Sequence, residues 1–361
     1  PHLRDANRDG DAFGDGKGYR YPHAFREHWV AQQYLPTALQ GEAFWSPSRQ
    51  GWEGERRERM LERRAAQLAA SAEAVDEHPL LVSSGPEQPE LERWLQRQLS
   101  MDGERLQELR EKLWSDMSWQ RTDRVLVLGG RSLLWSLDPL GAVAEGGLTI
   151  LCSSSKEQMR LEAQLQLLDP IHQPTVITDV DELERLNPNQ GFEVVGGRLN
   201  QEDLNNSDLE RFWSSVSSRS SSGTQLRLLL SEPQLGPAGG LLELMMSDGQ
   251  KRRASASLQQ LADQESTWLS QKEQHRKLLD HLDRCGWVTH QSSWQESLKL
   301  AVEPALIERW LGDDRPYRRA LEATGADSET AVSDLRHELR RQRGRHLPQS
   351  LRHWRIEGQL N

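Results

Sequence analysis

The chain has 361 residues, of which 35% are apolar and 28% are charged, and its formal net charge is −10. This length allows about two or three domains, and the negative charge excludes a protein that coats nucleic acid with its whole surface, because that activity needs a basic face. The two cysteines, Cys152 and Cys285, exclude a disulfide framework and a thiolate metal site, and no apolar run approaches the roughly 18 residues of a membrane span.

The chain opens on Pro1 with no initiator methionine, so we expect a piece of a longer, cytoplasmic polypeptide. Its first feature is the glycine-rich stretch "GDAFGDGKGYRYPH" at residues 10–23. Five residues separate Gly10 from Gly16, one more than a phosphate-binding loop has, and Gly18 stands where that loop needs a metal-binding hydroxyl. The stretch is therefore predicted to be a polar surface loop without a nucleotide.

Cations alternate with aromatic rings in "KGYRY", and such a pattern is able to stack on single-stranded bases. The surrounding segment cannot build a core of its own, which favours docking of the rings onto protein instead. Both alternatives stay open, and the candidate residues for contact with DNA or a partner are Lys17, Tyr19, Arg20, Tyr21 and Trp29.

Two amphipathic helices are predicted next. From Glu55 onward, apolar residues recur at spacings of three and four through Val75, and leucines recur in the same way at residues 91–113. The proline-containing run around residues 79–90 separates the two helices and is predicted to be a linker.

After Arg124, short apolar strands alternate with helical stretches, which is typical of a doubly wound, mostly parallel α/β sheet. A serine-rich stretch at 214–222 is expected to be a flexible linker, and His275 and His281 are expected on the surface of a long helix at 258–284. The predicted strands lie at residues 124–130, 148–154, 174–180, 192–197, 224–233, 288–302 and 351–359.

The opening residues carry a specific resemblance through "PHLRDA", "GKGYRYPH", "QQYLP" and a closing Arg/Glu-rich helix. Over about the first 65 residues the chain resembles the C-terminal tail of the replication-associated recombination protein A family, the MgsA/RarA-type AAA+ ATPases. The resemblance implies a parent protein that hydrolyses ATP with Mg²⁺ at stalled replication forks and DNA ends. It also implies an α-helical domain that forms homotetramers, with the ATPase motifs upstream of Pro1.

Residues 88–361 resemble the Rossmann-like class I S-adenosylmethionine-dependent methyltransferase fold, through the rhythm of their strands and the "LDRCGW" element. The resemblance implies S-adenosylmethionine as cofactor, with Gly129, Gly130 and Ser153 as its candidate contacts. The motifs depart from the family, because no acidic residue precedes the glycines and strand two ends in Cys152 and Ser153 instead of Asp or Glu. Both polar anchors of the cofactor are therefore missing.

No catalytic or metal-binding residue is predicted; Glu193 and Asn200 are the only polar candidates on the strand that usually carries the catalytic motif. We expect a tail of the oligomerisation domain at 1–65, a helical linker at 66–118 and a methyltransferase-like domain at 119–361. The favoured function is an assembly and interaction module for DNA replication and repair, which self-associates and meets DNA and fork proteins through its parent. An active methyltransferase, and a single-stranded-DNA-binding module using "KGYRY" and the arginines of residues 336–346, are the alternatives.

Overall fold

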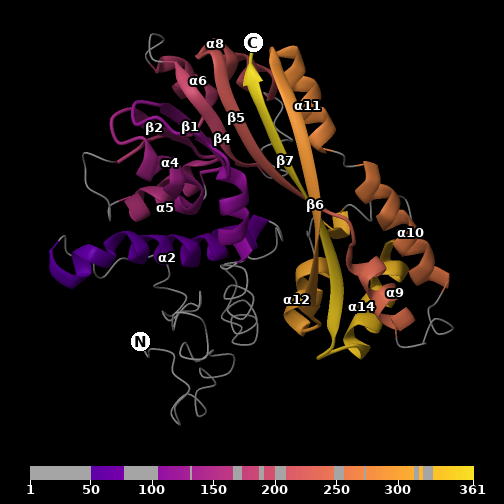
Figure 1. The fold of residues 1–361 in the computed structure, drawn as a ribbon. Helices are drawn as coiled ribbons and strands as arrows, with labels where there is room; N and C mark the ends of the chain where they lie inside the picture. Colours follow the sequence, from indigo (N-terminus) through magenta and orange to yellow (C-terminus); the bar gives the residue numbers. More distant parts are fainter. Residues whose placement is uncertain are drawn as a thin grey trace.

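The computed structural model describes residues 50–76, 105–130, 132–165, 173–186, 191–199, 209–247, 256–271, 274–312, 317–319 and 328–361. Within them, one seven-stranded sheet has the order β3-β2-β1-β4-β5-β7-β6 (Figure 1). This arrangement confirms the predicted doubly wound α/β fold. The strands are β1 (Arg124–Leu128), β2 (Gly147–Leu151), β3 (Thr175–Ile177), β4 (Phe192–Leu199), β5 (Ser220–Pro233), β6 (Trp287–Ala301) and β7 (His346–Leu360).

The strands from β3 to β5 pair in parallel, whereas β7 pairs antiparallel with both β5 and β6. The strand order reverses at β1, which lies between β2 and β4. In an open sheet of this kind, ligands bind beyond the carboxyl ends of the strands at such a reversal. The region that follows β1 and β4 is therefore the first place to look for a functional site.

Helices precede the sheet, alternate with its strands and lie between β6 and β7 (Figure 1). Residues 105–114 are also helical. Among the described helices, none is both long and apolar enough to cross a membrane. The bounded helices are α2 (Gly51–Asp76), η4 (Leu133–Ser136), α4 (Leu137–Ala142), α5 (Ser155–Leu165), α6 (Val180–Arg185), α8 (Leu209–Ser218), α9 (Pro237–Ser247), α10 (Ala256–Gln271), α11 (Gln274–Arg284), α12 (Pro304–Leu311) and α14 (Ser328–Arg341).

Alternate residues of β1 belong to different hydrophobic cores. Val125 and Val127 pack in one cluster with the helical residues 105–114, while Leu126 and Leu128 pack in another with α8 and α11. Since successive side chains of a strand point to opposite faces, these two cores cover the two faces of the sheet. An uninterrupted apolar strand such as "RVLVL" is what burial on both faces requires.

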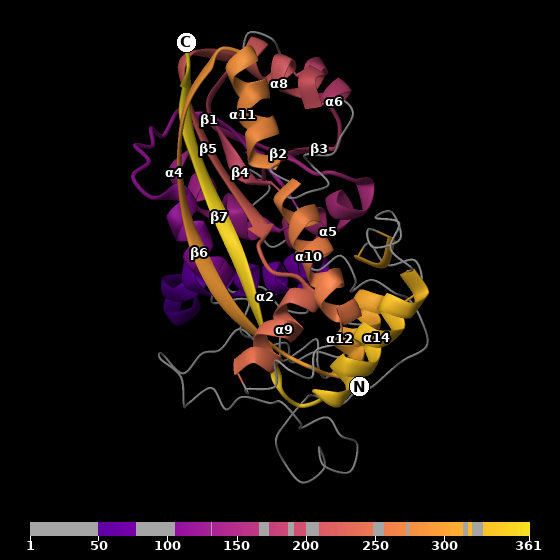
Figure 2. The same cartoon turned by 90° about the vertical axis from the view of Figure 1, so that its right-hand side faces the viewer.

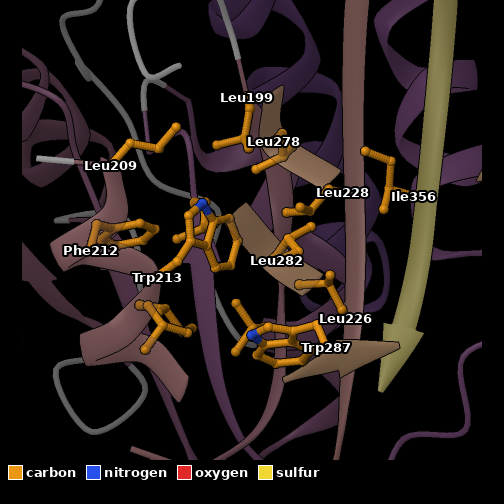
Figure 3. Packing of buried hydrophobic residues seen from close by; sticks show 14 of the residues in the cluster. Leu199, Leu209, Phe212, Trp213, Leu226, Leu228, Leu278, Leu282, Trp287 and Ile356 are labelled. Atoms are coloured by element: carbon orange, nitrogen blue, oxygen red, sulfur yellow. The ribbon is translucent and has the colours of Figure 1, made fainter. Parts of the chain in front are cut away.

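Large aromatic side chains fill the core on the α8 and α11 face (Figure 3). Trp213 and Trp287 are both almost completely buried, and their rings meet edge to face with centroids 6.5 Å apart. Leu278 and Leu282 of α11 complete the packing against the sheet (Figure 3).

A third core lies at the far end of β6 and β7, where α9, α10, α12 and α14 gather (Figure 2). Leu300 of β6 and Leu347 of β7 are paired in the ladder and both belong to this core. At the other end of the same two strands, Trp287 pairs with Leu360 inside the α8 and α11 core. The hairpin of β6 and β7 thus joins two separate hydrophobic cores.

The serine-rich stretch differs from its prediction. Residues 214–218 complete α8 and Ser220 begins β5, so this stretch is not a flexible linker. Phe212, Trp213 and Val216 form a buried face at helical spacing, which outweighs the weak helix propensity of the serines. Ser215 also contributes, because its hydroxyl donates a 2.7 Å hydrogen bond to Glu184.

The shared hairpin predicts that the two cores unfold together. Replacing buried Leu282 (α11) or Leu306 (α12) with alanine should each lower the free energy of unfolding by about 2–5 kcal/mol. Both variants should keep a single denaturation transition, followed by circular dichroism and tryptophan fluorescence. Val288→Ala, at a side chain 49% exposed, is the matched control and should change little. Two separate transitions, each moved by only one of the two leucine variants, would contradict this.

Candidate functional site

The carboxyl ends of β1, β2 and β4 converge at the reversal of the strand order. Gly129 and Gly130 follow β1, Cys152 follows β2, and Arg198 lies near the end of β4. The backbone N–H of Gly130 donates a 2.9 Å hydrogen bond to the carbonyl oxygen of Leu151, which ties the turn after β1 to β2. We call this region the crevice.

Both glycines of the crevice are packed against the chain itself. Gly129 has a φ of +73°, and a Cβ atom there would lie 1.9 Å from the carbonyl oxygen of Arg198. A Cβ atom on Gly130 would lie 2.6 Å from Ile150 and 2.8 Å from the sulfur of Cys152. The absence of side chains at these positions therefore serves close approach between neighbouring strands.

Bulky side chains of η4 follow directly after the turn. Ser132 caps this short helix, and Leu133, Leu134 and Trp135 are all buried behind it. The Trp135 carbonyl oxygen accepts a 2.9 Å hydrogen bond from the indole of Trp114. The ring of Trp135 lies under the guanidinium of Arg198, whose central carbon is 5.1 Å from the ring centroid. Large side chains thus occupy the space next to the turn.

The sulfur of Cys152 donates a 3.3 Å hydrogen bond to the carbonyl oxygen of Gly130. Burial, helped by the nearby negative charges of Glu157 and Glu162, raises the pKa of the Cys152 thiol to about 12. This side chain is therefore uncharged at neutral pH, where an acidic residue would be negative. Ser153 is exposed, and its backbone N–H donates to Glu157 at 2.7 Å.

The other sequence candidates do not gather at the crevice. Glu193 lies at the start of β4, the opposite end of the strand, and holds Arg124 through an ion pair of 2.6 Å. Asn200 and the candidate contact residues Lys17, Tyr19, Arg20, Tyr21 and Trp29 lie outside the described residues. Within the described part of the chain, no three His, Cys, Asp or Glu side chains are arranged to hold a metal ion.

A polar network runs from the carboxyl end of β5 across the middle of β7 to β6. The hydroxyl of Ser231 lies 2.8 Å from Nδ1 of His353, and Nε2 of the same ring lies 2.8 Å from the carboxylate of Glu296. Arg198 donates to the Ser231 hydroxyl at 3.4 Å, and Arg105 pairs with Glu296 at 3.2 Å. None of these five residues was singled out from the sequence, because they come from five separate segments and form no local motif.

A second buried cluster surrounds Glu232, which follows Ser231 in β5. Glu232 accepts hydrogen bonds from the backbone N–H of His275 at 3.1 Å and from the indole of Trp354 at 2.7 Å. The ring nitrogen Nδ1 of His275 lies 3.1 Å from the same carboxylate, and the ring stacks on Trp354. His275 is only 4% exposed, so its predicted place on the surface was wrong. Apolar spacing alone could not reveal this carboxylate partner.

Helix α2 packs against η4 and lies below α4 and α5 in the view of Figure 1. Ala65 of α2 is buried in the same core as Leu134 and Trp135. Arg110 links α2 to α4, because it pairs with Glu62 of α2 at 2.6 Å and with Asp138 of α4 at 3.1 Å. The helix runs on past residue 65, where the sequence analysis placed a domain boundary.

Strand order and the reversal at β1 define a doubly wound, Rossmann-like domain. Solved structures similar to the chain include geranyl diphosphate C-methyltransferase from Streptomyces coelicolor A3(2), which is 12% identical, covers 77% of this chain and 86% of its own, and has a TM-score of 0.37. The precorrin-6y C5,15-methyltransferase of Geobacter metallireducens GS-15 is also 12% identical, with coverages of 53% and 77% and a TM-score of 0.34.

The other end of the chain matches a different family. Residues 1–64 match the model described as MgsA AAA+ ATPase C terminal. The chain is 41% identical over 51 residues to replication-associated recombination protein A of Bacillus subtilis (strain 168). That match spans 14% of this chain and 12% of the relative. A segment that matches the MgsA C-terminal family is thus joined to a doubly wound α/β domain, and α2 begins within the matched segment.

The packing of Gly129 predicts a large cost for any side chain there. Gly129→Ala and Gly223→Ala both place alanine at a positive φ, of +73° and +90°, which costs about 1–2 kcal/mol. Only Gly129→Ala also drives its Cβ into a neighbouring backbone, so it should be less stable by about a further 1–3 kcal/mol. Denaturant titrations measure both variants; equal losses would show that the turn is able to move away from β4.

Proposed function

We propose that this chain is the C-terminal part of an AAA+ ATPase of recombination and replication-fork maintenance, and acts there as an assembly and interaction module. The match of residues 1–64 to the MgsA C-terminal family supports this proposal, as does the similarity to replication-associated recombination protein A. Since the chain covers only 12% of that relative, the ATPase activity, with ATP and Mg²⁺, belongs to the proposed parent. The parent would act in the cytoplasm and bring the module to DNA and fork proteins.

The close packing beside the turn after β1 is the observation that supports the second half of the proposal, a sheet domain without methyl transfer. A working cofactor site needs room for the methionine and ribose moieties beside the turn after β1. Here Leu134 and Trp135 are fully buried in that region, and α2 packs against the segment that contains them. Opening the region would expose part of a hydrophobic core, at a cost of about 1.5–3 kcal/mol for each large side chain.

The neutral charge of the Cys152 side chain also argues against a working cofactor site. An acidic residue after strand two would accept hydrogen bonds from the ribose hydroxyls, whereas the Cys152 thiol is neutral and already donates to Gly130. Loss of a hydrogen bond to a charged group costs about 1.5–3 kcal/mol, which is about 10-fold to 150-fold in affinity. The assignment of Gly129, Gly130 and Ser153 as cofactor contacts therefore has little support from their surroundings.

Helix α2 suggests how the module is assembled. It begins in the segment that matches the ATPase family and packs into the core of the sheet domain through Ala65, reinforced by the ion pair of Glu62 with Arg110. Self-association of the tail, proposed as a homotetramer, would therefore fix the position of each sheet domain relative to the oligomer. Contacts of Lys17, Tyr19, Arg20, Tyr21 and Trp29 with DNA or partner proteins belong to the same proposal.

Titration with S-adenosylmethionine tests the loss of methyl transfer. Isothermal calorimetry of the whole chain should give no saturable heat at micromolar cofactor concentrations, because the crevice is filled and lacks its acidic anchors. Ser153→Ala should behave like the unmodified chain, and an active class I methyltransferase under the same conditions is the positive control. Micromolar saturation, with formation of S-adenosylhomocysteine, would establish the enzyme alternative instead.

Sedimentation velocity tests the assembly role. The whole chain should sediment as a species of about four times the 41.3 kDa of one chain, while a chain that lacks residues 1–49 should be smaller. Circular dichroism of the shortened chain is the control for folding of the sheet domain. A monomeric whole chain with intact secondary structure would contradict self-association.

A further inference from the structure

Three adjacent strands bring a serine, a histidine and a carboxylate into line. Ser231 of β5 is directly opposite His353 of β7 in the antiparallel ladder, and Glu296 of β6 approaches the same ring from the other side. Both heavy-atom distances are 2.8 Å. Short hydrogen bonds in the order hydroxyl, imidazole, carboxylate are the arrangement that activates a serine for nucleophilic attack.

The hydrogen-bond partners fix the tautomer of His353. An ionised carboxylate is only an acceptor, so Nε2 of His353 must carry the proton that is donated to Glu296. The lone pair of Nδ1 then faces Ser231 and accepts its hydroxyl proton. Burial opposes ionisation of Glu296, but the hydrogen bond from His353 and the positive charge of Arg105 outweigh it and lower the pKa of Glu296. The carboxylate is therefore ionised at neutral pH.

Packing holds the histidine ring in this orientation. His353 is completely buried, and the indole of Trp294 stacks on it with ring centroids 5.2 Å apart. Lys112 lies over Trp294, 4.8 Å from its centroid. Burial lowers the pKa of His353, although Glu296 opposes this effect. The ring is thus uncharged and ready to act as a base at neutral pH.

We propose that Ser231, His353 and Glu296 form a hydrolytic site for small carboxylic esters, with Ser231 as nucleophile and His353 as general base. Glu296 is a positioning residue, because it acts through the ring of His353. The site lies at the carboxyl end of β5, next to the filled crevice, and it requires no bound cofactor. It is independent of the proposed assembly function.

The reaction balances with water as the only co-reactant. The hydroxyl proton of Ser231 moves to Nδ1 of His353 while Oγ bonds to the ester carbonyl carbon, and the carbonyl π electrons move onto its oxygen. Collapse of this oxyanion breaks the bond to the leaving alcohol, which takes the proton from the imidazolium. Water then attacks the acyl-serine by the same two steps, which releases the carboxylic acid and restores Ser231.

Arg198 supplies positive charge beside the Ser231 hydroxyl. Its guanidinium donates to the Ser231 hydroxyl and is 5% exposed, so its charge acts in surroundings from which most water is excluded. The aromatic face of Trp135, in η4, contacts the same guanidinium. Preorganised donors of this kind stabilise the developing negative charge of acyl transfer.

Covalent labelling of the unmodified protein tests the nucleophile without relying on a variant that folds. A fluorophosphonate probe should attach to Ser231 with release of fluoride, and peptide mass spectrometry should locate a single adduct there. Ser231→Ala should abolish labelling, whereas Ser350→Ala on β7, which removes a hydroxyl bonded to Gln295, should label normally. Absence of an adduct, or an adduct on another serine, would overturn the proposal.

Hydrolysis of p-nitrophenyl acetate tests the two partners of the serine. His353→Gln should slow turnover by about 100-fold or more, as loss of a general base does. Glu296→Gln should lower the plateau rate and move the acidic limb of the pH–rate profile to lower pH. The Glu296 carboxylate raises the pKa of His353, so its removal should lower that pKa. The charges that face this ring are those of Glu296, Arg198 and Arg105. An unchanged rate in His353→Gln, or an unmoved limb in Glu296→Gln, would count against the site.

Discussion

The antiparallel ladder of β7 is the constraint on which the rest of the structure depends. It pairs with β5 from Pro233 to Gln225 and with β6 along fifteen successive residues, from Trp287 to Ala301. One end of this ladder is buried under α8 and α11, and the other end under α9, α10, α12 and α14. The same pairing sets Ser231 opposite His353. The pairing register of β7 with β5 and β6 therefore positions both hydrophobic cores and the polar network of Ser231, His353 and Glu296.

The residues of the crevice are packed closely against one another. The glycines after β1 remain, but their spaces are occupied by Arg198, Ile150 and Cys152. Trp135 and Leu134 extend the packing toward α2. Strand order and chemical function are consequently separable, and the function of this domain must be argued from its side chains.

Apolar patterning was sufficient to predict the parallel sheet, because continuous apolar strands such as "RVLVL" and amphipathic helices carry the signal themselves. It failed at residues 214–222, where three apolar side chains of α8 bury a serine-rich helix. The absence of an acidic residue at Cys152 and Ser153, after β2, was also visible in the sequence. By contrast, the partnership of Ser231, His353 and Glu296 depends on strand register, as does that of His275 and Glu232. Distant residues that meet only through tertiary pairing leave no local pattern.

Helix α2 gives the two parts of the chain a mechanical connection. Its 26 residues form one continuous element, about 39 Å long. It starts in the segment that matches the MgsA C-terminal family and is fixed to the sheet domain through Ala65 and Glu62. A flexible tether would let the domains tumble independently. A stiff helix that is anchored to the sheet domain instead transmits motion. A rotation of its amino-terminal end would therefore rotate the whole sheet domain as well.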